Sequence, residues 1–313
     1  MKKALLSLLF LFCVMVTGVF SDSPGRLDLE LYGGLGNLAY NRNRTSALSD
    51  ESDPHAFGPN YFPLILARIS GEFSGIGFDA GFERDPVVRN IIFTNLKIVR
   101  DYFSFEAGPF ISIFDTWKLP ISPGISAGLG LAVPGKVFAN IKGSSTLGVP
   151  MDITDNFSLN TGDISVGFWV PHVICSFNLR FLNYTKREQS NLLVEDGLNR
   201  YFFRFDVFAK NVPYTIRLDL GYQNLIRSYS SQKVSGVDIV KDTGKDEFKS
   251  IFLGLEGSYT FNETLKFVLG GEIPVYSWGV RPMKDPAKGT VLFKARTGVV
   301  WTLPVKNDQE SAR

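Results

Sequence analysis

The sequence predicts an all-β protein, an antiparallel transmembrane β-barrel of about 14 strands, on the strength of three observations. Apolar and polar residues alternate with a period of two through most of the chain, short and long connectors alternate between these segments, and the N-terminus has the layout of an export signal. Hydrophobic residues make up 44% of the 313 residues and charged residues 20%. This composition excludes a disordered chain and a helical membrane protein.

The alternation gives each segment two chemically different faces. In residues 27–32, three leucines alternate with Asp28, Glu30 and Tyr32, and residues 214–222 repeat the pattern with larger apolar side chains. Successive side chains of a strand point to opposite faces, so each segment presents one apolar face and one polar or small face. We expect strands near 26–35, 62–73, 75–84, 89–99, 102–114, 123–133, 136–145, 162–170, 173–184, 200–210, 214–228, 248–261, 264–275 and 290–303.

The connectors between these segments decide the architecture. Tight connectors at 74–75, 100–101, 134–135, 171–172, 211–213 and 262–264 alternate with longer polar ones at 36–61, 85–88, 115–122, 146–161, 185–199, 229–247 and 276–289. An exported β-sandwich also has alternating strands, but it has no reason to alternate its connector lengths. A transmembrane β-barrel has short periplasmic turns and longer extracellular loops, so the pattern favours the barrel.

Aromatic residues recur near the ends of the predicted strands, as the two interfacial girdles of a barrel require. They are Phe73, Phe103, Tyr214, Phe261 and Trp301 on the short-connector side, and Phe82, Phe181, Tyr201, Tyr222 and Phe293 on the other. The apolar faces run for about ten residues, which matches the ~9–11 residues that a tilted strand needs to cross a bilayer.

The strand number has two candidate values. Fourteen is even, as in single-chain bacterial barrels, and it returns both ends of the barrel to the periplasm. Twelve strands remain an alternative, because residues 85–99 do not alternate cleanly and Pro109 interrupts the following segment. A proline cannot donate to the strand ladder, so we expect a β-bulge at Pro109.

The N-terminus predicts export. Residues 1–21 combine the basic Met1-Lys2-Lys3 with an apolar run and a small residue at the end, which is typical of a signal peptide cleaved after Ser21. We therefore expect a signal peptide at 1–21, a barrel at 22–303 and a periplasmic tail at 304–313. Cleavage removes two of the 33 basic residues, leaving 31 against 31 acidic residues. This neutral balance gives no reason to expect nucleic-acid binding.

The last predicted strand carries the one family resemblance. Residues 296–303, Arg-Thr-Gly-Val-Val-Trp-Thr-Leu, resemble the final-strand signal of bacterial outer-membrane β-barrels, in the porin-like class. The matching positions are Gly298, Trp301 and Leu303. The resemblance implies recognition by the barrel-assembly machinery and a place among the lipids of the outer membrane. The chain departs from many such barrels in continuing past the signal, from Pro304 to Arg313.

With the apolar face assigned to lipid, the charged face lines the lumen. The predicted lumen-lining residues are Arg68, Glu72, Asp79, Glu106, Lys142, Arg180, Arg204, Asp206, Arg217, Asp219, Glu256, Lys266, Glu272, Lys294 and Arg296. So many charges are hydrated, paired across the lumen, or both, because uncompensated burial is costly. Six aromatic residues share this face and favour a partly filled lumen: Phe110, Phe138, Trp169, Phe202, Phe208 and Phe252.

We therefore expect a passive outer-membrane pore for small hydrophilic solutes. The alternatives are a surface-exposed structural or adhesion barrel with a blocked lumen, and a hydrophobic-substrate transporter. An enzyme is not expected, because His55 and His172 are the only histidines and neither lies in a predicted strand. No motif predicts a cofactor or a metal ion. An extracellular ligand of the surface loops stays unidentified.

Overall fold

The computed structural model of the protein describes residues 25–40, 57–73, 75–85, 89–113, 121–147, 157–189, 192–208, 212–235, 238–278 and 292–305. The predicted signal peptide, His55 and residues 306–313 of the predicted tail lie outside these ranges. The strands are β1 (Gly25–Tyr40), β2 (Phe57–Phe73), β3 (Ile76–Asp85), β4 (Arg89–Val99), β5 (Phe103–Ile113), β6 (Ile121–Val133), β7 (Val137–Thr146), β8 (Phe157–Val170), β9 (Val173–Gln189), β10 (Leu192–Phe208), β11 (Tyr214–Ser235), β12 (Asp238–Thr260), β13 (Leu265–Trp278) and β14 (Lys294–Val305).

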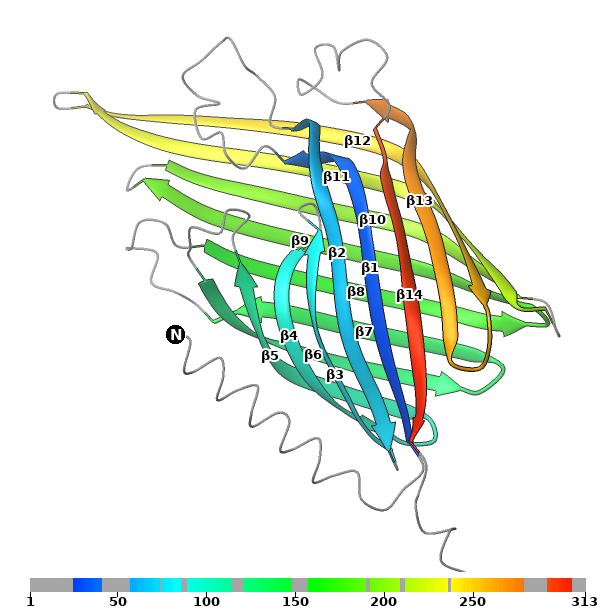
Figure 1. Ribbon diagram of the computed structural model, residues 1–313. Helices are drawn as coiled ribbons and strands as arrows, with labels where there is room; N and C mark the ends of the chain where they lie inside the picture. Colours follow the sequence, from blue (N-terminus) through cyan, green and yellow to red (C-terminus); the bar gives the residue numbers. More distant parts are fainter. Residues whose placement is uncertain are drawn as a thin grey trace, which may run out of the picture.

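The strands form one closed antiparallel barrel in which each pairs with its neighbours in sequence (Figure 1). The barrel closes between β1 and β14, where the pairs run from Gly25 with Val305 to Gly36 with Lys294. The prediction of a 14-stranded antiparallel barrel is therefore confirmed, and the 12-stranded alternative is wrong. The ends of β1 and β14 meet at the end of the barrel that carries the short turns. Pro304 and Val305 belong to β14, so the strand runs two residues into the predicted tail.

The outer surface of the barrel is suited to lipid. On β11 the outward positions from Tyr214 to Tyr222 alternate with lumen-facing Arg217 and Asp219, and Leu220 among them is exposed. Exposed leucine, isoleucine, valine and phenylalanine side chains continue around the barrel on the same face. A water-soluble monomer does not expose a contiguous apolar surface of this extent. The protein is therefore a transmembrane barrel of the outer-membrane type. No helix in the described ranges is long and apolar enough to cross a membrane.

Aromatic side chains mark both edges of this apolar belt. Towards the short turns, Tyr214, Tyr259, Phe267 and Trp301 are exposed. Towards the other end, Tyr201 lies 6.2 Å from Tyr222, and Tyr222 lies 5.8 Å from Trp278, measured between ring centroids. Phe73, which we expected in the girdle on the short-turn side, is instead buried.

The predicted connectors at 185–199 and 229–247 are wrong. Strands β9 and β10 extend to Gln189 and from Leu192, and β11 and β12 extend to Ser235 and from Asp238. The β11–β12 hairpin continues past the aromatic edge for about 40 Å of strand length, and it is the long yellow hairpin of Figure 1. These segments resembled loops because outward positions in them, such as Glu195, Lys245 and Glu247, are polar.

Pro109 does not produce the expected bulge. The pairing of β4 with β5 keeps one register from Ile91 with Ser112 to Val99 with Ser104. The pairs opposite Pro109 and Gly108 are missing from the ladder, so the strand tolerates the absent donor without inserting a residue. Gly108 allows this close approach, because a Cβ atom there would overlap the backbone carbonyl of Thr94.

Candidate functional site: the charged lumen

The register places the side chains of every predicted lumen residue on the face opposite the lipid-facing one. Most of them meet in ion pairs, and we call this set of paired side chains the charged band. Glu72 is exposed and Lys266 is half-buried, and both lie near the short-turn end of the lumen. The band also includes Glu30, Asp85, Asp163 and Arg200, of which Asp85 and Arg200 were not predicted to face the lumen.

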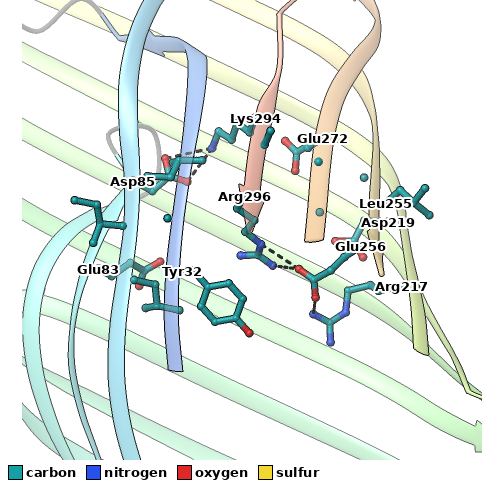
Figure 2. Close-up of a pocket in the computed structure, with 18 of the residues that line it drawn as sticks. Tyr32, Glu83, Asp85, Arg217, Asp219, Leu255, Glu256, Glu272, Lys294 and Arg296 are labelled. Carbon is teal, nitrogen blue, oxygen red and sulfur yellow. Dashed lines mark hydrogen bonds and ion pairs between the residues drawn. The ribbon is translucent and has the colours of Figure 1, made fainter. Parts of the chain in front are cut away.

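Part of the band is a chain of charges that crosses several strands. Arg217 on β11 donates through Nε to Asp206 Oδ1 (2.6 Å) and through Nη1 to Glu256 Oε1 (3.0 Å). Arg296 on β14 donates through Nε to the other oxygen of Glu256 (3.0 Å). Figure 2 shows Glu256 held between the two guanidinium groups. Because β12 and β14 are not neighbours in the sheet, the Arg296–Glu256 pair spans the lumen face of β13.

Three further pairs join strands that are not hydrogen-bonded neighbours. Arg200 on β10 pairs with Glu272 on β13. Lys294 Nζ on β14 lies 2.9 Å from Asp85 Oδ2 on β3 (Figure 2). Lys142 Nζ on β7 lies 2.7 Å from Glu106 Oε1 on β5. Each of these pairs spans the lumen face of one or two intervening strands.

Adjacent strands contribute bidentate pairs. Arg68 donates through Nε and Nη2 to the two carboxylate oxygens of Asp79 at 2.6 and 2.9 Å. Arg204 makes the same arrangement with Asp219 at 2.8 and 2.8 Å. Arg180 pairs with Asp163 across β9 and β8. Two parallel charge-assisted hydrogen bonds fix the direction of each guanidinium group.

The described lumen holds two cavities beside this band. The first, of about 200 Å³, is lined by side chains of β1, β2, β3 and β9–β14, among them Tyr32, Arg200, Arg204, Glu272, Lys294 and Arg296. In Figure 2, Glu83 and Asp85 of β3 lie on one side of this cavity and Arg217 and Glu256 of β11 and β12 on the other. The second, of about 220 Å³, is lined by residues of β2–β7, including Arg68, Asp79, Phe93, Phe110 and Lys142. Leu66 and Glu83 line both cavities.

Beyond the charged band, towards the long-connector end, the lumen face becomes apolar. We call these buried residues the mouth cluster: Leu38, Phe62, Ile91, Phe93, Phe110, Phe157, Leu159, Leu182, Tyr184, Leu198, Leu225, Phe248 and Leu292. They come from nine strands and from the segment before β14. Phe157 stacks on Tyr184 at a centroid distance of 5.3 Å. Above this cluster, Arg227 makes a bidentate pair with Asp196 at 2.7 and 2.9 Å, and both are buried.

Arg200 lies where the charged band meets the apolar side chains. It is 7% exposed, and its guanidinium carbon lies 3.7 Å from the ring centroid of Phe252 and 5.3 Å from that of Phe202. Its Nε is buried and has no hydrogen-bond partner within the described part of the chain. The sequence carried a signal for Arg200, because it has the same strand parity as Phe202 and Arg204. The pair of Asp196 with Arg227 is not predicted from the sequence, because the pattern places Asp196 in the connector at 185–199.

The remaining predicted residues lie as follows. Trp301 and Leu303 of the assembly signal are exposed on the lipid-facing side. Gly298 is on the lumen face, where a Cβ atom would overlap the Tyr32 ring. His172 occupies the exposed turn between β8 and β9 with φ of 67°, and Cys175 lies on the lipid-facing side of β9. The described residues contain no group of three or more His, Cys, Asp or Glu side chains that could hold a metal ion.

No protein-family model matches the chain, and no curated protein matches it. Among solved structures, the chain is similar to an outer membrane channel from Pseudomonas putida F1, with 9% identity and a TM-score of 0.42 over 91% of this chain and 98% of that chain. It is similar to a bacterial polysaccharide outer membrane secretin, with 9% identity and a TM-score of 0.45 over 90% and 98%. It is also similar to a porin, with 10% identity and a TM-score of 0.39 over 90% and 100%. All three TM-scores lie below 0.5, so we infer the chemistry of this lumen from its own residues alone.

Proposed function

We propose that this protein is a bacterial outer-membrane pore that passes small hydrophilic solutes. The observation that carries the proposal is the partial exposure of charged side chains inside a closed barrel. The side chain of Arg296 is 46% exposed and that of Arg217 is 35% exposed, although both lie on the lumen face. Charged groups in this state are hydrated, because a dry and incompletely paired charge would be expensive. A water-filled, charge-lined lumen is the lining that a diffusion pore uses.

The charged band supplies the solute-lining surface in this proposal. The predicted lumen residues from Arg68 to Arg296, together with Arg200 and Asp85, bound the path past the two cavities. The paired charges keep the lumen near neutral, so the path favours neutral or weakly charged hydrophilic solutes over strongly charged polymers. Passage of this kind needs no catalytic residue and no cofactor.

The orientation of the barrel follows from its connectors. The short turns and the ends of β1 and β14 lie in the periplasm, and the extended β11–β12 hairpin lies outside the cell. We further propose that residues 1–21 direct export, that residues after 303 form a periplasmic tail, and that Gly298, Trp301 and Leu303 are read by the barrel-assembly machinery. Exposed Trp301 and Leu303 fit this role, because a recognition signal has to be accessible before the barrel closes.

Planar-bilayer recording of the refolded protein tests the pore. We expect discrete current steps whose size increases with salt concentration. A protein that shows heat-modifiable gel mobility, and is therefore a folded barrel, but gives no current steps would overturn the proposed function. A detergent-independent soluble monomer would overturn the transmembrane barrel itself.

A second candidate function is a surface-exposed structural or adhesion barrel with a blocked lumen. The mouth cluster favours it, because its 13 side chains are buried and come from strands all around the barrel. In this case the charged band would stabilise the barrel, and the extended hairpins would present the functional surface. The same bilayer recording separates the two candidates, since a blocked lumen gives no current.

A further inference from the structure

The first cavity is lined by both charged and apolar side chains. Arg200, Arg204, Lys294 and Arg296 line it together with the carboxylates that pair with them, Glu272, Asp219, Asp85 and Glu256. Arg84, Arg180 and Arg217 also line it, with Glu83 as one further acid, so seven basic side chains face five acidic ones. Leu64, Leu66 and Phe202 line the same cavity, and Leu64 packs against the mouth cluster. A solute in this cavity therefore meets an excess of positive charge together with hydrocarbon. The second cavity is different, because its two basic side chains, Arg68 and Lys142, are matched by two acidic ones, Asp79 and Glu83.

Arg200 has hydrogen-bonding capacity that the described structure does not use. One terminal nitrogen pairs with Glu272, while the buried Nε has no partner among the described residues. A buried donor of a charged group without an acceptor is unfavourable. The guanidinium plane is held by Phe252 at 3.7 Å, so the group is oriented before any ligand arrives. A carboxylate matches the spacing of two neighbouring guanidinium donors.

The neighbours of Arg200 also favour an anion. Arg180 on β9 is directly opposite Arg200 on β10 in the strand register, and Arg204 is the second residue along the same face. Like charges directly opposite each other in a sheet are destabilising. Their carboxylate partners lie on three different strands, with Asp163 on β8, Asp219 on β11 and Glu272 on β13. An anion beside Arg200 would reduce the repulsion within this arginine group.

We propose that the first cavity binds a small amphipathic organic anion, with its carboxylate at Arg200 and its apolar part against Leu64, Leu66 and Phe202. This inference deepens the proposed function, on which it rests, by naming the class of solute that the pore retains. The cavity volume of about 200 Å³ limits the ligand to a short chain or a single ring with its carboxylate, because drug-sized ligands occupy larger pockets.

The test is binding to the folded barrel in detergent, measured by calorimetry with four probes: hexanoate, hexanamide, acetate and inorganic phosphate. We expect hexanoate to bind about tenfold or more tightly than each of the other three, because only hexanoate has both the charge and the apolar part. If hexanamide binds as tightly as hexanoate, or if acetate or phosphate does, the amphipathic-anion site is wrong.

A paired variant shows whether binding depends on Arg200. Arg200→Met combined with Glu272→Gln removes the cation without leaving a lone carboxylate in the lumen, and we expect it to abolish hexanoate binding. The matched control is Arg227→Met with Asp196→Asn, which removes a buried pair that does not line the cavity. It should retain hexanoate binding, and heat-modifiable mobility shows that each variant is folded. Arg200→Lys keeps the charge but loses the guanidinium geometry, and we expect weakened binding.

Hexanoate binding and ion conduction test the ligand site and the pore separately. A barrel that conducts but does not bind hexanoate would overturn this inference and leave the pore intact. A barrel that binds hexanoate but does not conduct would overturn the pore and keep the ligand site. Hexanoate binding that survives in the Arg200→Met and Glu272→Gln variant would place the anion elsewhere and contradict the assignment.

Discussion

In two parts of the molecule, the apolar side chains of β10 and β11 lie on opposite faces of these strands. Within the membrane, β10 and β11 turn Tyr201 and Leu220 towards lipid and Arg204 and Arg217 towards the lumen. Beyond the aromatic edge, outward Asn199 and Asn224 are polar, whereas inward Leu198 and Leu225 are buried and apolar. The strand register continues through this change. The surrounding solvent, lipid or water, therefore selects which face carries the apolar side chains at these positions.

The change of solvent also divides the lumen. The membrane part contains hydrated charges and two cavities, whereas the outer part has the packed apolar interior of a water-soluble β-protein. A substitution on the lumen face should therefore have very different effects at the two levels.

The largest effect is expected for Leu225→Asp. Leu225 is 0% exposed in the mouth cluster, so the new carboxylate would be buried without a partner. We expect the barrel to lose about 5 kcal/mol of unfolding free energy, or not to fold at all. Urea unfolding in detergent measures the loss. Lys266→Asp, at a half-buried position on the same face near the short turns, should change it by less than about 1 kcal/mol. Equal losses at the two positions would mean that the lumen has one uniform environment.

Phe157→Ala tests the mouth cluster as a constriction. Phe157 is buried and stacked on Tyr184, and removing its ring leaves a cavity. We expect a loss of about 3–4 kcal/mol in stability together with a larger single-channel conductance. Trp169→Ala, on the lumen face of the same strand near the short turns, is the matched control and should leave the conductance nearly unchanged. Unaltered conductance in Phe157→Ala would show that the cluster does not limit the path.

Two bidentate pairs of similar geometry give the cleanest comparison. Asp196→Asn breaks the pair with Arg227. The side chain of Arg227 is 4% exposed and that of Asp196 is 1% exposed. Asp219→Asn breaks the pair with Arg204. The side chain of Arg204 is 30% exposed and that of Asp219 is 14% exposed. We expect about 3 kcal/mol of lost stability for the first and about 1 kcal/mol for the second, because lumen water screens the exposed arginine. A larger loss for Asp219→Asn would reverse the assignment of wet and dry regions.

The smallest effect concerns the outer surface of the extended hairpin. Hydrogen bonds from Lys245 and Lys249 lower the pKa of Glu247 below the ordinary glutamate value of 4.5. A carboxylate with a lowered pKa contributes stability above its unfolded pKa, and that contribution is lost as the pH falls through the folded pKa. We expect a slight fall in Tm below about pH 4.5 that is absent in Glu247→Gln. An identical pH profile in both proteins would remove Glu247 from the account.

The sequence predicted the membrane part far better than the outer part. Leucines alternating with Asp28, Glu30 and Tyr32 identified both the strand and its lumen face, because lipid imposes one apolar side on every strand. Beyond the membrane the same rule fails. Polar Glu195 and Asn199 point outward there, so residues 185–199 resembled a solvated loop although Leu198 points inward and is buried.

The candidate site shows the same division. The alternation of side chains between the two faces of each strand was sufficient to place four residues on one face: Arg204, Arg217, Glu256 and Arg296. It could not show that Arg296 and Glu256 meet across β13, or that Arg200 reaches Glu272, because these contacts depend on the curvature of the closed barrel. The mouth cluster was missed for a related reason, since its members lie near the ends of nine strands and no local pattern joins them.

The most direct test of the central claim is solute flux through the purified barrel in liposomes. Proteoliposomes loaded with a large dextran are diluted into isotonic solutions of a small sugar, and swelling is followed by light scattering. We expect swelling with arabinose and faster swelling for Phe157→Ala, with none when the external solute is itself a dextran. Folded barrel that gives no swelling with arabinose, in both the wild-type protein and Phe157→Ala, would contradict the hydrated passage.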